Sequence, residues 1–321
     1  MQQRRLGRSG LSVSCLGLGT WLWGQDTDEH EAKDALTAFV DAGGTLVDTA
    51  ASYGDGASER VLGGLIDKVV ARDELVIATK AGLGTRRGEW GADTSRGGLL
   101  RQLDGSLHRL GLDEVDLWQV HVWSRTAPWQ ETLSALDYAV SSGRARYVGI
   151  SNWSGWQTGL GYAWQAAAPG RAPLVSTQVE YSLLNRAIED EVLPAARALG
   201  MGVLAWSPLG RGVLTGKYRA GVPADSRAAT PHLGSNVEPY LDEGSHGIVE
   251  AVVRAADGLG LSPIQTALAW VLARPGLSSA LVGARTTAQL TASLDAWEVE
   301  LPQEIVDALD DVSDEGADTP S

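Results

Sequence analysis

The chain has 321 residues, 44% of them hydrophobic, one cysteine and a formal net charge of −14 at pH 7. This acidity makes nucleic acids and anionic membrane surfaces poor partners, because both would repel the protein. The lone cysteine, Cys15, excludes an intrachain disulfide and agrees with a reducing, cytoplasmic setting. No apolar run reaches the roughly 18 residues that a membrane-spanning helix needs, and no signal peptide is evident.

The first residues include QRRLGRSGLSVS, whose Ser-Gly pair indicates a β-hairpin that closes the bottom of a barrel. After it, short apolar, β-branched runs alternate with longer helical patterns. Near-continuous apolar strands of this kind are typical of a parallel sheet covered on both faces. The expected strands are residues 12–19, 45–50, 75–80, 115–121, 145–151, 175–181, 202–208 and 279–284.

The segments between these strands carry helix start and stop signals. Glycines end two of them as C-caps, Ser95 is an N-cap candidate, and Pro128 falls in the first turn of its segment. The expected helices cover residues 29–43, 95–111, 126–143 and 190–200.

Eight strands that alternate with helices predict a single (β/α)8 TIM barrel domain over residues 1–321. Two segments, 82–94 and 209–244, are too long for plain connectors. Long segments of this kind in a compact domain are usually functional or disordered, and we expect them at the C-terminal face of the barrel. Residues from about 314 to 321 are expected to form a flexible tail.

Three successive strands stay apolar until their last residues and then become ionisable. They end at Asp48, Lys80 and His121, and Tyr53 follows on the loop after the second strand. Each residue alone has an ordinary structural reading, as a cap, a solvated end or a packed ring. Together at one barrel mouth they favour chemistry, because barrel enzymes place catalytic groups at the C-terminal strand ends.

This set of side chains limits the possible reactions. It lacks the ligands of a zinc site, and the chain has no G-x-S-x-G nucleophile motif. A phenol at about 4 Å from a lysine ammonium gains on the order of 4 kcal/mol at an effective dielectric of 20, so we expect the pKa of Tyr53 to be lowered toward neutrality. Tyr53 would then protonate a carbonyl oxygen, His121 would orient that oxygen, and a nicotinamide would deliver hydride to the carbon.

The strings GTLVDTAASYGDGASERVLGGL, LVIATKAG, DLWQVH, YVGISNW, TQVEYSLLNR, WSPLGRGVLTGKY and VGART resemble blocks of the aldo-keto reductase family in the expected order. The resemblance covers nearly the whole chain and is closest to the branch of bacterial aldo-keto reductases and potassium-channel β subunits. It implies that Tyr53 is the general acid, that Lys80 and Asp48 assist it, and that His121 orients the substrate.

The resemblance also implies an NADPH site at the barrel mouth that lacks the G-x-G-x-x-G fingerprint. Arg285 is the candidate partner of the 2′-phosphate, because a guanidinium fork matches that group. Ala292 stands where the family has a polar side chain near adenine, so NADH is possible as well. The implied cofactor residues are Thr20, Trp21, Asp48, Ser151, Asn152, Gln178, Trp206, Ser207, Pro208, Leu209, Gly210, Gly212, Lys217, Arg227, Gly283, Arg285, Gln289 and Ser293.

The expected substrate is a small carbonyl compound, which the sequence does not identify. The expected pocket residues are Trp21, Trp23, Tyr53, Trp90, His121 and Trp123; for the tryptophans after the strands, surface packing is the competing interpretation. Two other functions compete with the reductase: an NADPH-binding regulatory protein like the channel β subunits, and a barrel isomerase or hydrolase. Self-association is not predicted in either direction, and no metal site is expected.

Overall fold

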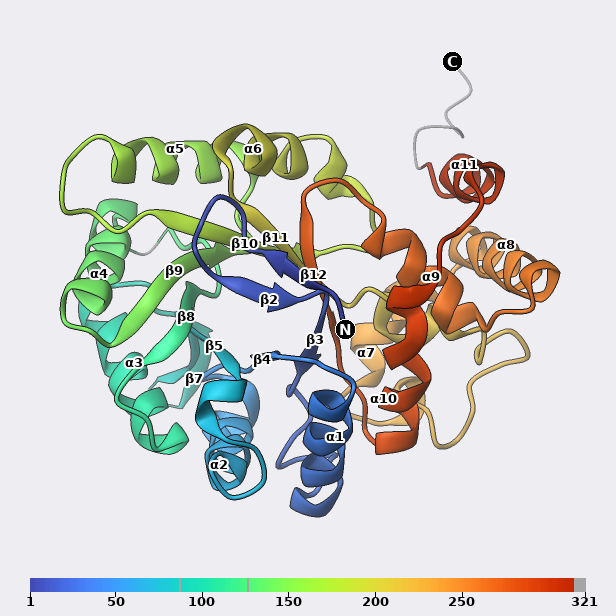
Figure 1. Cartoon of the computed structure of the whole chain (residues 1–321), viewed down its shortest axis with the longest axis horizontal. Coiled ribbons are helices and arrows are strands. Elements are labelled where there is room, and N and C mark those ends of the chain that lie inside the picture. The colour runs from blue at the N-terminus through green and yellow to red at the C-terminus, as the bar shows by residue number, and fades with distance from the viewer. Residues whose placement is uncertain (87, 126, 315–321) are drawn as a thin grey trace.

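The structure, a computed structural model, describes residues 1–86, 88–125 and 127–314. Eight parallel strands form a closed barrel in the order β10-β11-β12-β3-β4-β5-β8-β9, and helices surround it (Figure 1). The predicted (β/α)8 barrel is therefore confirmed. The barrel strands are β3 (Leu16–Gly19), β4 (Leu46–Asp48), β5 (Val76–Ala81), β8 (Val115–Val120), β9 (Ala145–Ser151), β10 (Leu174–Glu180), β11 (Gly202–Trp206) and β12 (Leu277–Val282).

The expected first strand, 12–19, is in fact two strands with different partners. β2 (Ser12–Ser14) pairs antiparallel with β1 (Gln3–Arg5), whereas β3 pairs with β12 and β4 in the barrel. Sequence alone merged them because the apolar run continues through the change of partner at Cys15.

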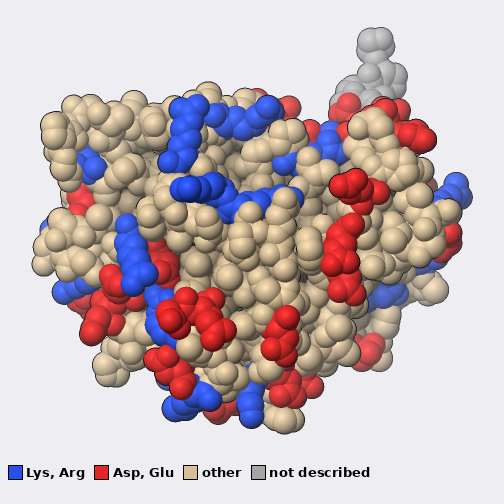
Figure 2. Space-filling view, viewed as in Figure 1, with Lys and Arg blue, Asp and Glu red and all other residues tan. Residues whose placement is uncertain are grey.

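The hairpin β1–β2 closes the bottom of the barrel, as the sequence predicted. Leu6 and Val13 are fully buried and pack with Leu46, Leu117 and Leu204 inside the barrel. Figure 1 views this end of the molecule, with the hairpin lying across the middle. Figure 2 shows that side chains cover the centre of this face and that many acidic groups gather along its rim. The remaining opening of the barrel is therefore at the strands' C-terminal ends.

Helices cover the outside of the barrel, and several of them begin with a side-chain N-cap. Ser95 accepts a hydrogen bond from Gly98 N, and Gly111 ends the same helix in the left-handed conformation, both as expected. Pro128 is the residue before its helix and does not lie in the first turn; Thr126 lies outside the described residues. The helices are α1 (Glu29–Asp41), α2 (Ala57–Leu65), α3 (Arg96–Leu110), α4 (Trp129–Ser141), α5 (Gly155–Ala166), α6 (Val192–Leu199), α7 (Gly234–Val237), α8 (Glu243–Leu259), α9 (Pro263–Leu272), α10 (Thr287–Leu294) and α11 (Gln303–Val312).

The two long segments have structure of their own. Within 82–94, β6 (Leu83–Arg86) and β7 (Glu89–Ala92) form an antiparallel hairpin. Within 209–244, short 3-10 turns and α7 follow β11 at the barrel mouth. The expected tail falls almost wholly on residues 315–321, which lie outside the described residues.

Candidate active site

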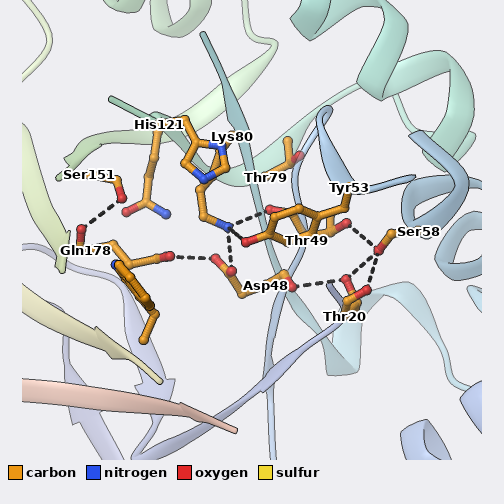
Figure 3. A network of polar contacts seen from close by, with 12 residues as sticks. Thr20, Asp48, Thr49, Tyr53, Ser58, Thr79, Lys80, His121, Ser151 and Gln178 are labelled. Atoms are coloured by element: carbon orange, nitrogen blue, oxygen red, sulfur yellow. Dashed lines mark hydrogen bonds and ion pairs between the residues drawn. The ribbon is translucent and has the colours of Figure 1, made fainter. Parts of the chain in front are cut away.

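The barrel topology brings the four predicted catalytic side chains together. Asp48 ends β4, Lys80 lies one residue before the end of β5, and His121 directly follows β8. These three strands are adjacent in the barrel, so their C-terminal ends meet at one mouth. Tyr53 reaches the same place from the loop after β4, as Figure 3 shows.

Lys80 is the centre of this polar network. Its Nζ, fully buried, donates to Asp48 Oδ1 at 2.5 Å, to the backbone oxygen of Thr49 at 2.8 Å and to Tyr53 Oη at 3.2 Å. The second oxygen of Asp48 accepts from Gln178 Nε2 at 2.9 Å. Both charges of the pair are thus hydrogen-bonded, which a buried ion pair requires.

Tyr53 differs from the expectation in its ionisation. Burial raises the pKa of Tyr53 above its usual value of 10.0, and the nearby Lys80 charge offsets only part of that effect. The lowered pKa expected from sequence is therefore wrong, because the sequence does not show how completely the phenol is withdrawn from water. Lys80 remains the cation: burial alone would lower its pKa, yet Asp48 and Tyr53 together raise it.

His121 is a neutral imidazole. Burial, assisted by the Lys80 charge, lowers the pKa of His121 to about 3. Its ring meets the Tyr53 ring edge-on, with the ring centroids 5.9 Å apart. Ser52 Oγ lies 3.5 Å from Nδ1, at the limit of a hydrogen bond. A neutral ring next to a protonated phenol gives two hydrogen-bond donors for one acceptor oxygen.

A cavity of about 660 Å³ extends from these residues along the C-terminal strand ends. Its lining includes Asp48, Tyr53 and His121, and also Arg285 and Gln289, which follow β12. The other predicted cofactor residues that line it are Trp21, Asn152, Trp206, Ser207, Pro208, Leu209, Gly212, Lys217, Arg227, Gly283 and Ser293.

Comparison with known proteins decides the family. The model of the "Aldo/keto reductase family" matches residues 15–314. The chain belongs to the aldo/keto reductase family. Similar proteins include the "Uncharacterized oxidoreductase YrpG" of Bacillus subtilis (strain 168), which is 37% identical over 100% of this chain and 98% of its own.

Two further relatives show how functions differ within this family. A "Probable voltage-gated potassium channel subunit beta" of Oryza sativa subsp. japonica is 37% identical over 97% of this chain and 96% of its own. An "L-glyceraldehyde 3-phosphate reductase" of Escherichia coli (strain K12) is 37% identical over 92% of this chain and 87% of its own. The relatives thus include oxidoreductases and proteins named for a channel.

Four predicted cofactor residues of this aldo/keto reductase do not line the cavity. Thr20, Ser151, Gln178 and Gly210 are buried behind its wall. Ser151 Oγ donates to the backbone oxygen of Gln178 at 2.8 Å, and Gln178 in turn holds Asp48. Ser151 and Gln178 therefore hold Asp48, which faces the cavity, in place through hydrogen bonds.

The predicted aromatic rim is not formed by the three loop tryptophans. Trp23 is only 1% exposed and packs in the core. Trp90 is 62% exposed on the β6–β7 hairpin, and Trp123 packs edge-on against Trp153 and Trp156. None of the three is among the described residues that line the cavity, whereas Trp21 is. The direction of an aromatic side chain in a loop depends on backbone geometry that the sequence pattern does not show.

Sequence reasoning also missed cavity residues, and Arg211 is the clearest case. It lies between the predicted Gly210 and Gly212, adopts a positive φ of 56°, and pairs with Glu180 at 3.0 Å. The sequence did contain a signal for Arg211, because this residue lies between two glycines that were predicted to bind the cofactor. The other missed residues are Gly19, Thr215, Asn236, Ile264, Leu281, Val282 and Ala288, whereas Ala292, which the sequence placed near adenine, also lines the cavity.

Three cations gather at the cavity wall. Burial lowers the pKa of Lys217, and the charges of Arg227 and Arg285 lower it further. Burial likewise lowers the pKa of Arg227, whose guanidinium lies 5.3 Å from the centroid of the Trp21 ring. Within the described part of the chain, none of the three forms a salt bridge with a carboxylate. Mutual repulsion of this kind is relieved by a bound anion, so the donor set fits a phosphorylated cofactor.

The described residues contain neither a helix of membrane-spanning length and hydropathy nor a cluster of metal ligands. No helix among them is long and apolar enough to cross a bilayer. No group of three or more His, Cys, Asp or Glu side chains among them is placed to hold a metal ion.

Proposed function

We propose that this protein is an NADPH-dependent reductase that converts aldehydes or ketones to alcohols, with Tyr53 as the general acid. The observation that carries the proposal is the Tyr53 phenol, protonated, 3.2 Å from a buried ammonium and facing a cavity whose other wall is cationic. A proton donor at one end and an anion site at the other match a carbonyl substrate and a phosphorylated hydride donor.

A bound nicotinamide cofactor would supply the hydride for this reaction. Tyr53 gives its proton to the carbonyl oxygen as negative charge develops there. Lys80 then stabilises the phenolate of Tyr53, because its ammonium is already in hydrogen-bond contact with that oxygen. Asp48 keeps Lys80 ionised within the buried network. His121, which is neutral, orients the carbonyl oxygen with a ring N–H.

Cofactor binding is assigned to residues along the cavity. Asn152 and Trp206, joined by a hydrogen bond of 3.0 Å from the indole N–H, would hold the nicotinamide. Lys217 and Arg227 would neutralise the diphosphate, and Arg285 would bind the 2′-phosphate. Ala292 lines the same wall and offers adenine no side-chain hydrogen bond, so we propose NADPH as the preferred but not exclusive cofactor.

A substrate panel tests the proposal. The purified protein is mixed with NADPH, and separately with NADH, together with aldehydes, ketones and quinones, and oxidation is followed by absorbance. Substrate-dependent oxidation that is faster with NADPH is the expected result. Tight NADPH binding without oxidation by any compound would overturn the reductase. It would favour the regulatory function that the similarity to a channel β subunit suggests.

A further inference from the structure

Two consecutive polar residues at the start of α2, Ser58 and Glu59, are fully buried. A buried carboxylate is costly unless it is paired and hydrogen-bonded. Both residues follow the loop that carries Tyr53, and both face the barrel strands that carry the catalytic groups. Their contacts define how that loop is attached to the barrel.

Glu59 links α2 to β5 and α3. Its Oε1 accepts a hydrogen bond from Thr79 Oγ1 at 2.6 Å, and its Oε2 accepts from Arg109 Nε at 2.7 Å. Thr79 directly precedes Lys80 in the strand. The carboxylate therefore ties the first turn of α2 to the residue that precedes Lys80 in β5.

Ser58 makes the matching link toward β4. Its Oγ donates to the backbone oxygen of Thr20 at 2.8 Å and lies 3.0 Å from Thr49 Oγ1 (Figure 3). Thr49 directly follows Asp48. Residues 58 and 59 together thus contact the chain neighbours of Asp48 and Lys80.

The loop between Tyr53 and α2 depends on this attachment. Gly54, Asp55 and Gly56 have consecutive positive φ values of 56°, 49° and 81°, a sharp turn with no regular helix of its own. The guanidinium of Arg109 packs so closely against Gly56 that a Cβ there would collide with its Nε. The place where α2 begins therefore determines where this turn, and the phenol before it, can lie.

We propose that Glu59, held by Arg109, is a positioning residue that fixes the Tyr53 loop against β5 and so sets the contact between the phenol and Lys80. The proposal rests on the proposed function of Tyr53 as the general acid. A misplacement of about 1 Å in a reacting group costs on the order of 100-fold in rate. Loss of one of the two anchoring bonds should therefore appear in kcat.

The decisive variants are Thr79→Val and Thr79→Ser. Valine keeps the shape of threonine but removes the hydroxyl that Glu59 accepts from, while serine keeps that hydroxyl. We expect Thr79→Val to lower kcat about tenfold with the Kd of NADPH near wild type. Its melting temperature should fall, because one buried oxygen of Glu59 loses its donor, and Thr79→Ser should restore most of the rate. The basic limb of the kcat–pH profile should move to higher pH in Thr79→Val, because a longer contact with Lys80 raises the pKa of Tyr53.

Thr132→Val is the matched control. This buried threonine donates to the backbone oxygen of Thr94 at 2.8 Å, and neither residue lines the cavity. Its kcat and pH profile should equal those of the wild type. A Thr79→Val protein with wild-type kcat, or with a lower rate that an active-site titration explains entirely by fewer active molecules, would overturn the positioning role.

Glu59→Met tests the same contact from the helix side, because methionine has no carboxylate to accept from the Thr79 hydroxyl. The double variant Glu59→Met/Thr79→Val should be no slower than Glu59→Met alone, because the Glu59–Thr79 bond is already lost in the single variant. A double variant whose loss in kcat is the product of the two single losses would contradict the proposal, and if Glu59→Met does not fold, the Thr79 variants decide. A Tyr53→Phe enzyme with full activity would instead show that the proposed general acid is wrong, which separates the two failures.

Discussion

The Nζ atom of Lys80 lies 2.5 Å from Asp48 Oδ1, and both side chains are almost completely closed to solvent. The Lys80 ammonium is therefore balanced by the carboxylate as well as shared with Tyr53. Burial keeps the proton on the Tyr53 phenol despite a cation at 3.2 Å, and the Asp48 charge adds to that effect by raising the pKa of Tyr53 further. The protonation of Tyr53 therefore depends on the hydrogen-bonded group of Asp48, Lys80 and Tyr53 as a whole.

Asp48→Asn should strongly destabilise the protein. The substitution keeps the shape but leaves Lys80 as a buried cation without its counter-ion, a change that costs about 3–5 kcal/mol in unfolding free energy. Urea unfolding of both proteins measures it. Glu250→Gln, which breaks an exposed pair with Arg219, is the control and should unfold like the wild type. An Asp48→Asn midpoint equal to that of the control would refute the coupling.

Tyr53→Phe should abolish most of the reduction and spare cofactor binding. Loss of a positioned general acid lowers the rate by about 10²–10⁴-fold. The phenyl ring keeps the packing against His121, so NADPH affinity, measured by quenching of tryptophan fluorescence, should change little. Equal loss of binding and turnover would mean that Tyr53 supports the fold of the site.

His121 predicts a pH dependence of stability. The pKa of His121 is about 3 in the folded protein, against the usual value of 6.5 for histidine, so the unfolded chain binds more protons between these values. Stability from this residue is full above pH 6.5 and falls on acidification, by at most about 1.4 kcal/mol per pH unit. The difference in unfolding free energy between wild type and His121→Asn should shrink from pH 7.5 to pH 5. A constant difference would show that His121 titrates normally.

Arg285→Leu should separate the two nicotinamide cofactors. A lost hydrogen bond to a charged group costs about 1.5–3 kcal/mol, equal to about 10- to 150-fold in the Kd of NADPH. The Kd of NADH should stay nearly constant. Lys217→Met is the comparison variant and should weaken both, because both cofactors carry the diphosphate. Equal effects of Arg285→Leu on the two cofactors would place the 2′-phosphate elsewhere.

Much of the fold was predictable because the chain repeats one simple rule. Most barrel strands are short runs rich in apolar residues, and the ionisable residues at the ends of three neighbouring strands mark the mouth: Asp48, Lys80 and His121. Adjacent strand ends must meet in a barrel, so the network could be expected without knowing its distances. The change of partner at Cys15 was hidden because hydropathy does not record which strand pairs with which.

Other features of the site depend on three-dimensional detail. Glu59 and Arg109 have the charge and spacing of exposed helix residues, and only packing shows that they meet behind the catalytic strands. Trp23 and Trp90 look alike in sequence, yet one is in the core and the other is largely exposed. The sequence predicted a lowered pKa for Tyr53 because it considered only the attraction between the phenolate and Lys80. Burial, which the sequence does not show, raises the pKa instead.

The closed bottom of the barrel has a consequence for synthesis on the ribosome. Arg4, at the hairpin, donates to the backbone oxygen of Leu272, 268 residues away, and β3 pairs with β12. The nascent chain therefore carries an unpaired β3 edge until nearly all of its residues have emerged. Translation that stalls before Leu277 would release an open sheet, and such edges invite aggregation. Protection of that edge is therefore needed until the last barrel strand of this protein arrives.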